Sequence, residues 1–155
     1  MSIAIADAAH GETIAMGPSR LRVLEDGRNT GHRLAVAELS VPPGVLTGPP
    51  QHLHREHDET FYVLSGAPTF TCGADTTTGT PGMLLTAGIG VPHTFANPGD
   101  EPAVLLCTFT PDLYIDYFRE LGDLAQRTGR LDPAAVGEVM ARYATEVLDP
   151  VTPGS

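Results

Sequence analysis

The chain has 155 residues, enough for one domain of ordinary size with its own core, and its 41% apolar and 18% charged residues are typical of globular proteins. Nine arginines and no lysine stand against nineteen acidic residues, so the net charge is −10 and a polyanion such as DNA or RNA would be repelled. No apolar run approaches the roughly 18 residues of a membrane span, and residues 1–10 lack the basic segment of a signal peptide. Because the only cysteines, Cys72 and Cys107, make no disulfide framework, we expect a cytoplasmic protein with reduced thiols.

Short β-type runs, separated by glycine and proline, follow one another through most of the chain. The 17 glycines and 14 prolines gather in turn clusters between these runs. The alternation of apolar and polar residues predicts strands near 20–24, 32–41, 50–54, 59–65, 69–73, 83–87, 92–96 and 103–109. Many short strands without intervening helices predict an all-β protein, an antiparallel sandwich or barrel.

The pattern becomes helical towards the C-terminus. Asp112 is a candidate cap for a helix, because apolar residues follow it at near-helical spacing. A second helix is predicted to begin at Asp132 and Pro133, an N-cap followed by a first-turn proline, and to run to about Glu146. Residues 148–155 are expected to form a tail.

Three histidines and a glutamate stand near the starts of predicted strands. His52 and His54 are two residues apart, so on a strand their imidazoles point to the same face. Glu59 opens the next strand and His93 precedes a later one. A single histidine on a strand is more often a solvated or core residue than a ligand. Imidazole and carboxylate are, however, good ligands for divalent first-row metals, so the group of four indicates a metal site.

Two stretches of the chain resemble the paired signatures of the cupin superfamily. Residues 52–66 read His, one residue, His, four residues, Glu, six residues, Gly. Residues 82–97 read Gly, five residues, Gly, one residue, Gly, two residues, His, three residues, Asn, and fifteen residues separate the two stretches. The departures are Gly88, where the family usually has proline, and Leu46, where the first signature opens with glycine. The chain is similar to single-domain bacterial cupins that resemble quercetin dioxygenases.

This resemblance implies a fold and a metal centre. The fold would be a cupin barrel (a double-stranded β-helix, or jelly roll) over residues 1–111, with the helices and tail of residues 112–155 packed on the same single domain. One divalent ion per chain, Fe, Ni, Mn, Co, Cu or Zn, would lie inside the barrel. The metal ligands would be His52, His54, Glu59 and His93.

Two residues are candidates for proton transfer. In quercetinase-like cupins the glutamate ligand also takes the substrate's proton, so Glu59 would be both ligand and general base. His57 has two interpretations. It is either a solvated turn residue in the charged run 55–58, or an acid–base group at the barrel mouth or a fourth imidazole ligand.

The pocket around the metal is expected to be apolar. About half of the large apolar strand residues should face inward, and those near the metal would select a flat, largely apolar substrate. The strand residues concerned are Phe61, Val63, Phe70, Met83, Leu85, Phe95, Leu105 and Phe109. Tyr114, Tyr117 and Phe118 would either line the entrance or only cover apolar surface and form a dimer contact.

Three classes of function remain open from the sequence. The first is a dioxygenase that uses O2 and a redox-capable metal on a flavonol- or polyphenol-like substrate. The second is a non-redox metal-dependent cyclase or isomerase of polyketide biosynthesis, a branch of secondary metabolism. The third is a metal-containing module that binds a small molecule without turnover. In each case we expect a homodimer with no nucleic-acid or membrane partner.

Overall fold

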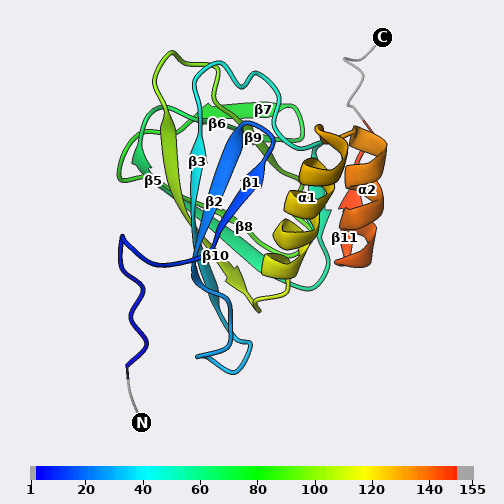
Figure 1. The fold of residues 1–155 in the computed structure, drawn as a ribbon. Helices are drawn as coiled ribbons and strands as arrows, with labels where there is room; N and C mark the ends of the chain where they lie inside the picture. Colours follow the sequence, from blue (N-terminus) through cyan, green and yellow to red (C-terminus); the bar gives the residue numbers. More distant parts are fainter. Residues whose placement is uncertain (1–2, 150–155) are drawn as a thin grey trace.

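The structure, a computed structural model, describes residues 3–149 and shows a β body with two helices beside it (Figure 1). The predicted tail over 148–155 therefore lies mostly outside the described residues. The helices are α1 (Tyr114–Thr128) and α2 (Pro133–Arg142). The strands are β1 (Thr13–Met16), β2 (Ser19–Glu25), β3 (Ala35–Val41), β4 (His52–His54), β5 (Asp58–Ser65), β6 (Thr69–Cys72), β7 (Asp75–Thr78), β8 (Leu84–Ala87), β9 (Thr94–Ala96), β10 (Ala103–Thr110) and β11 (Thr145–Val147).

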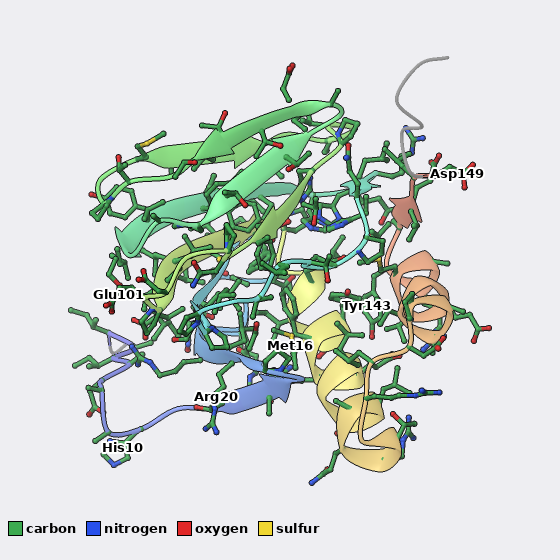
Figure 2. All side chains as sticks on the ribbon, turned by 90° about the horizontal axis from the view of Figure 1, so that it is seen from above. His10, Met16, Arg20, Glu101, Tyr143 and Asp149 are labelled. Carbon is green, nitrogen blue, oxygen red and sulfur yellow. The ribbon has the colours of Figure 1, made fainter. Side chains whose placement is uncertain are left out.

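The strands form antiparallel sheets. The largest has the order β1-β2-β3-β10-β5-β8, a second has the order β7-β6-β9, and β11 pairs with β4. Strand β4 is also joined to the residue before β9, because His52 and His93 exchange backbone hydrogen bonds of 3.1 and 2.8 Å. Figure 2 shows α1 beside the end of β1 near Met16, so the helices cover one side of the β body.

The core lies between the sheets, where the predicted alternation of side chains is found. Strands β3 and β10 alternate strictly between buried and less buried positions, as expected for half-buried strands. All eight predicted strands are present, β2 to β6 and β8 to β10, with ends displaced by up to three residues. The buried residues of these two central strands are Ala35, Ala37, Leu39, Val41, Ala103, Leu105, Cys107 and Phe109.

Three strands were not predicted from the sequence, because they carry little apolar alternation. All four residues of β7 are exposed, so no buried face marks it in the sequence. Strand β1 buries only Ile14. Strand β11 falls where the second helix was predicted to continue. That helix ends at Arg142 rather than near Glu146, because Ala144 has a left-handed φ of 49° and the chain then pairs with β4.

The predicted cap of the first helix is wrong, and that of the second is confirmed. Helix α1 has Leu113 at its N-cap, with no side-chain capping bond. The Asp112 carboxylate instead accepts a hydrogen bond of 2.7 Å from Nδ1 of His32. Asp132 caps α2 by accepting from the backbone N–H of Ala134 at 3.0 Å.

Two residues of the signatures make close contacts in the loops between strands. Gly66 has φ +80°, and a Cβ there would come within 2.5 Å of the Pro102 carbonyl, so only glycine fits. The buried Asn97 amide donates to the backbone carbonyls of Val41 and Glu101, at 3.1 and 2.9 Å. Gly66 thus packs against the start of β10, and Asn97 joins the loop after β9 to the end of β3 and to the loop before β10. No helix within residues 3–149 has the length and apolar character needed to cross a membrane.

Candidate metal centre

Four side chains from three parts of the chain converge inside the β body. His52 and His54 lie on the same face of β4, Glu59 lies on β5, and His93 lies just before β9. Each offers one ligand atom, and these four atoms all lie within 4.8 Å of one another. All four side chains are buried. The structure thus brings together the four residues that the sequence analysis selected.

The outer nitrogens of the three imidazoles are all held by oxygen acceptors. Nδ1 of His52 donates to the Pro50 carbonyl at 2.7 Å, and Nδ1 of His93 donates to the Val91 carbonyl at 2.9 Å. Nδ1 of His54 donates to the hydroxyl of Thr145 at 2.9 Å. That hydroxyl must accept, because it donates its own hydrogen to the Tyr143 carbonyl at 3.1 Å.

This hydrogen bonding fixes what the rings present to the centre. With Nδ1 protonated, a neutral imidazole turns the lone pair of Nε2 inward. Oε2 of Glu59 lies 2.8 Å from Nε2 of His54 and 3.2 Å from Nε2 of His93. Lone pairs and a carboxylate at these distances repel unless a proton or a cation lies among them. The donor set therefore fits a divalent cation, and three imidazoles with one carboxylate suit first-row metals.

The pKa shifts agree with such a site. Burial, with the nearby His93, lowers the pKa of His52 to about 4, so its ring is neutral at pH 7. Burial alone would raise the pKa of the Glu59 carboxyl, but the hydrogen bonds with His54 and His93 hold it well below its usual range. Burial also acts to lower the pKa of His93, but the Glu59 carboxylate outweighs it and raises that pKa. A bound cation would take the place of the proton that the Glu59 carboxylate stabilises on His93.

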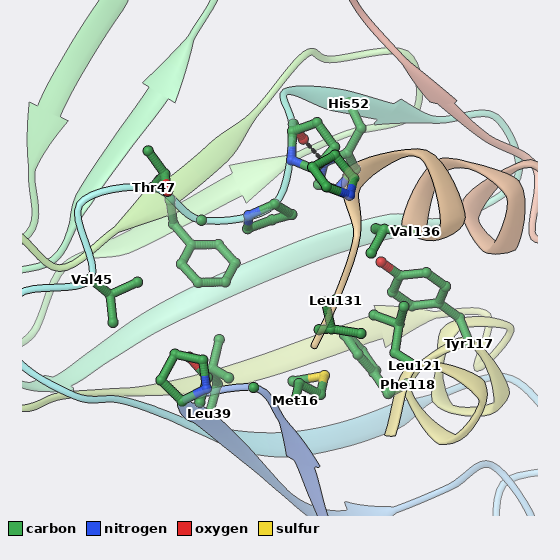
Figure 3. A pocket seen from close by; sticks show the side chains of 18 of the residues that line it. Met16, Leu39, Val45, Thr47, His52, Tyr117, Phe118, Leu121, Leu131 and Val136 are labelled. Atoms are coloured by element: carbon green, nitrogen blue, oxygen red, sulfur yellow. Dashed lines mark hydrogen bonds between the residues drawn. The ribbon is translucent and has the colours of Figure 1, made fainter. Parts of the chain in front are cut away.

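A cavity of about 700 Å³ leads to this centre (Figure 3). His52, Glu59 and His93 line it, whereas His54 lies deeper and is 1% exposed. No described residue donates a hydrogen bond to Oε1 of Glu59. The remaining wall is mainly apolar, which favours a largely apolar ligand. Its large apolar residues are Met16, Leu39, Val45, Phe61, Phe95, Phe118, Leu121, Leu131 and Val136.

The C-terminal helices supply part of that wall. Tyr114, Tyr117 and Phe118 all line the cavity, and the two tyrosines are each only 2% exposed. They therefore form an inner wall rather than an entrance. Of the strand residues expected to face inward, Phe61 and Phe95 line the cavity.

His57 is not a solvated turn residue. Its side chain is 0% exposed and stacks on His54 with ring centroids 4.0 Å apart. Its nitrogens are not among the converging ligand atoms, and the ring does not line the cavity. Neither ring nitrogen has a hydrogen-bond partner among residues 3–149. Burial, with the neighbouring His54, lowers the pKa of His57 to about 4, so the ring is neutral at pH 7.

Thr145 is the site residue that the sequence analysis missed. It lies 91 residues from His54 in the chain, in a segment predicted to be helical. Its only sequence signal is the β-branched alternation of Thr145 and Val147, which is too short to predict a strand. Pairing of β11 with β4 places its hydroxyl behind the imidazole.

Comparison with known proteins places the fold. The model of the Cupin domain family matches residues 37–109. Among solved structures, KdgF from Halomonas sp. is 17% identical with a TM-score of 0.60, over 72% of this chain and 94% of that one. The polyketide cyclase RemF from Streptomyces resistomycificus is 21% identical with a TM-score of 0.60, over 70% of this chain and 80% of that one.

A sugar phosphate isomerase of the cupin superfamily from Silicibacter pomeroyi is 24% identical with a TM-score of 0.58, over 67% of this chain and 73% of that one. No curated protein matches the chain. The architecture and both signatures agree with these similarities. The chain has the cupin fold, and its residues 37–109 match the Cupin domain family.

Proposed function

We propose that this protein is a metal-dependent enzyme that converts a flat, largely apolar substrate through its enolate or phenolate, in a ring closure or an isomerisation. The observation that carries the proposal is the position of the His/Glu cluster at one end of an apolar cavity of about 700 Å³. Such a cavity holds a drug-sized ligand and leaves its oxygen atoms facing the cluster.

The four converging side chains would hold the metal. A divalent ion bound by His52, His54, Glu59 and His93 would supply Lewis acidity, which would make the C–H beside a substrate carbonyl, or the O–H of a phenol, more acidic. His54 is held from behind by Thr145, which keeps its Nε2 directed inward.

Glu59 is positioned to move a proton. Its Oε2 is engaged by His54 and His93, while Oε1 has no hydrogen-bond donor among the described residues. Because the pKa of the carboxyl is held low, the group is ionised before a substrate arrives. Oε1 accepts a proton from the substrate and returns it at another atom, which is the proton transfer that an isomerisation or ring closure needs.

The names of similar structures support this class. They include a polyketide cyclase and a sugar phosphate isomerase, neither of which is named as an oxygenase. The dioxygenase indicated by the quercetinase resemblance stays a second candidate, because three imidazoles and one carboxylate also suit redox-active metals such as Fe or Ni.

A proton-exchange assay separates the two classes. The protein is stripped of metal and reconstituted with Zn, Fe, Ni or Mn. Each form is incubated under nitrogen in D2O with a hydroxyacetonaphthone, a flat probe with two adjacent metal-binding oxygens and an exchangeable acetyl methyl. We expect the Zn form to catalyse methyl deuteration, followed by NMR, and the Glu59→Gln variant to lose it. Absence of exchange in every anaerobic form, with O2 uptake matching probe loss in air, would establish the oxygenase instead.

A further inference from the structure

The geometry points to Arg130 as the binding site for a carboxylate at the end of the substrate remote from the metal centre. This inference rests on the proposed function, which places the reacting oxygens at the His/Glu cluster. It adds a substrate class: a flat aromatic molecule with metal-binding oxygens at one end and a carboxylate at the other.

Arg130 is an exposed residue that lines the main cavity, and it follows Gly129 at the end of α1. Figure 3 shows His52 on one side of the cavity and Met16, Leu39 and Leu131 across from it. Arg130 is the neighbour of Leu131 in the chain and lines the same cavity. A second cavity of about 520 Å³, between β1 and α1, is lined by Gly17, Gly129 and Arg130 as well, so the two cavities meet at these residues.

Arg130 is the only basic side chain, histidine aside, among the described residues that line the main cavity. It forms no ion pair within residues 3–149, and Glu59 is the only acidic residue of the lining. Because the chain carries a net charge of −10, most of its surface repels an anion. Arg130, an exposed residue that lines this cavity and forms no ion pair within residues 3–149, is therefore a local exception.

The backbone holds Arg130 in place. Helix α1 ends at Gly129, whose left-handed φ of 73° turns the chain towards α2. The hydroxyl of Thr128 donates to the Arg130 carbonyl at 2.5 Å. Asp132 then caps α2, so the residues on both sides of Arg130 are fixed. A guanidinium on such a support can bind a carboxylate through two parallel hydrogen bonds.

The cavity between the two ends determines the rest of the ligand. Phe61, Phe95 and Phe118 are among the apolar residues that line this cavity together with the cluster and Arg130. Two or three fused rings would fit this space, because the lining is mainly apolar and offers few polar side chains, among them Ser19 and Thr47. The ligand is thus an aromatic acid rather than a sugar or a nucleotide.

A matched pair of probes tests the inference. The first is a dihydroxynaphthoate with its two hydroxyls and its carboxylate on opposite rings, and the second is the dihydroxynaphthalene that lacks the carboxylate. Binding to the metal-loaded full chain is measured by calorimetry. The variants are Arg130→Gln, Arg130→Lys, and Arg127→Gln as control, because Arg127 is exposed, lies on α1 and does not line the cavity.

We expect the native protein to bind the carboxylate probe more tightly than the neutral one. Arg130→Gln should weaken the carboxylate probe about fivefold and leave the neutral probe unchanged, as for the loss of one partly exposed ion pair. Arg130→Lys should retain part of the preference and Arg127→Gln all of it. Added salt should reduce the preference, because the contact is solvent-accessible.

Three outcomes would overturn the inference: no binding of the carboxylate probe, no preference for it in the native protein, or equal weakening of both probes by Arg130→Gln. The proposed function fails separately. If the His52→Ala/His54→Ala variant binds both probes as tightly as the native protein, the hydroxyl end does not lie at the metal centre. Even then, a native preference for the carboxylate probe that disappears in Arg130→Gln would support a carboxylate-binding site at Arg130.

Discussion

At the scale of single residues, the orientation of the imidazoles decides what the centre can bind. His52 and His93 donate to carbonyls within two residues in their own loops, so their orientation is local. His54 depends on Thr145, from the far end of the chain. The signatures predicted all three rings and the carboxylate, because each signature is a short local pattern in the sequence. They could not predict Thr145, since only tertiary pairing brings it near.

Replacing Thr145 by valine tests this support. Valine keeps the shape and the β-propensity but removes the acceptor for Nδ1 of His54. We expect metal affinity to fall about tenfold, the lower end of what loss of a ligand's hydrogen-bond partner costs, while the fold is kept. Competition with a chelating dye measures the affinity. Thr71→Val, which removes an exposed hydroxyl pair on β6 and β7, is the control. Equal affinities for both variants would show that Thr145 does not support the site.

His57 makes stability depend on pH in the metal-free protein. Burial first, and His54 second, lower its pKa from 6.5 to about 4. Between these two values His57 binds a proton in the unfolded chain but not in the folded chain. Folding stability is therefore lost as pH falls from about 6.5 towards about 4. His52, with the same shift, acts in the same direction.

The variant His57→Phe removes one of these two contributions and two unpaired buried nitrogens. Between pH 7 and pH 4.5, with chelator present, we expect it to lose less unfolding free energy than the native chain, by up to about 3 kcal/mol. Urea unfolding at both pH values gives the difference. Replacement of the exposed His10 by glutamine should leave the native pH dependence intact. The same loss in His57→Phe as in the native chain would mean that His57 is not held neutral.

At the scale of elements, strand β11 connects the helices to the metal centre. Its pairing with β4 places Thr145 opposite His54 and Val147 opposite His52. Short β-type runs between glycine and proline clusters predicted eight strands. This pattern could not predict β11, because three residues after a helix carry too little pattern and the left-handed Ala144 gives no glycine signal.

Glu146→Pro tests the role of this strand. Glu146 pairs with Leu53, and proline there removes a backbone donor from the ladder. We expect the β body to stay folded by circular dichroism and metal affinity to fall at least as far as in Thr145→Val. Glu146→Gln keeps the backbone N–H and removes only the exposed ion pair with Arg55, so it should bind metal normally. If Glu146→Pro binds metal as tightly as the native protein, β11 does not support the metal centre.

At the scale of the whole molecule, the β body and the two helices together form the cavity. Its lining comes from β1, the loop before β4, the inner face of the sheets and both helices, with the loop between them. Residues from so many parts of the chain share no sequence motif. The sequence therefore predicted an apolar pocket, from the strand residues and the helix aromatics, but not the contribution of Met16, Leu131 or Arg130.

The metal content of the purified protein tests the central claim most directly. Purified without chelators and analysed by inductively coupled plasma mass spectrometry, the native chain should carry about one divalent ion, because four ligands converge on one point. His52→Ala/His54→Ala should carry almost none, whereas His10→Ala/His32→Ala, which removes two exposed histidines, should match the native protein. A native chain without a divalent ion after reconstitution, or full metal content in His52→Ala/His54→Ala, would contradict the assignment of the metal centre.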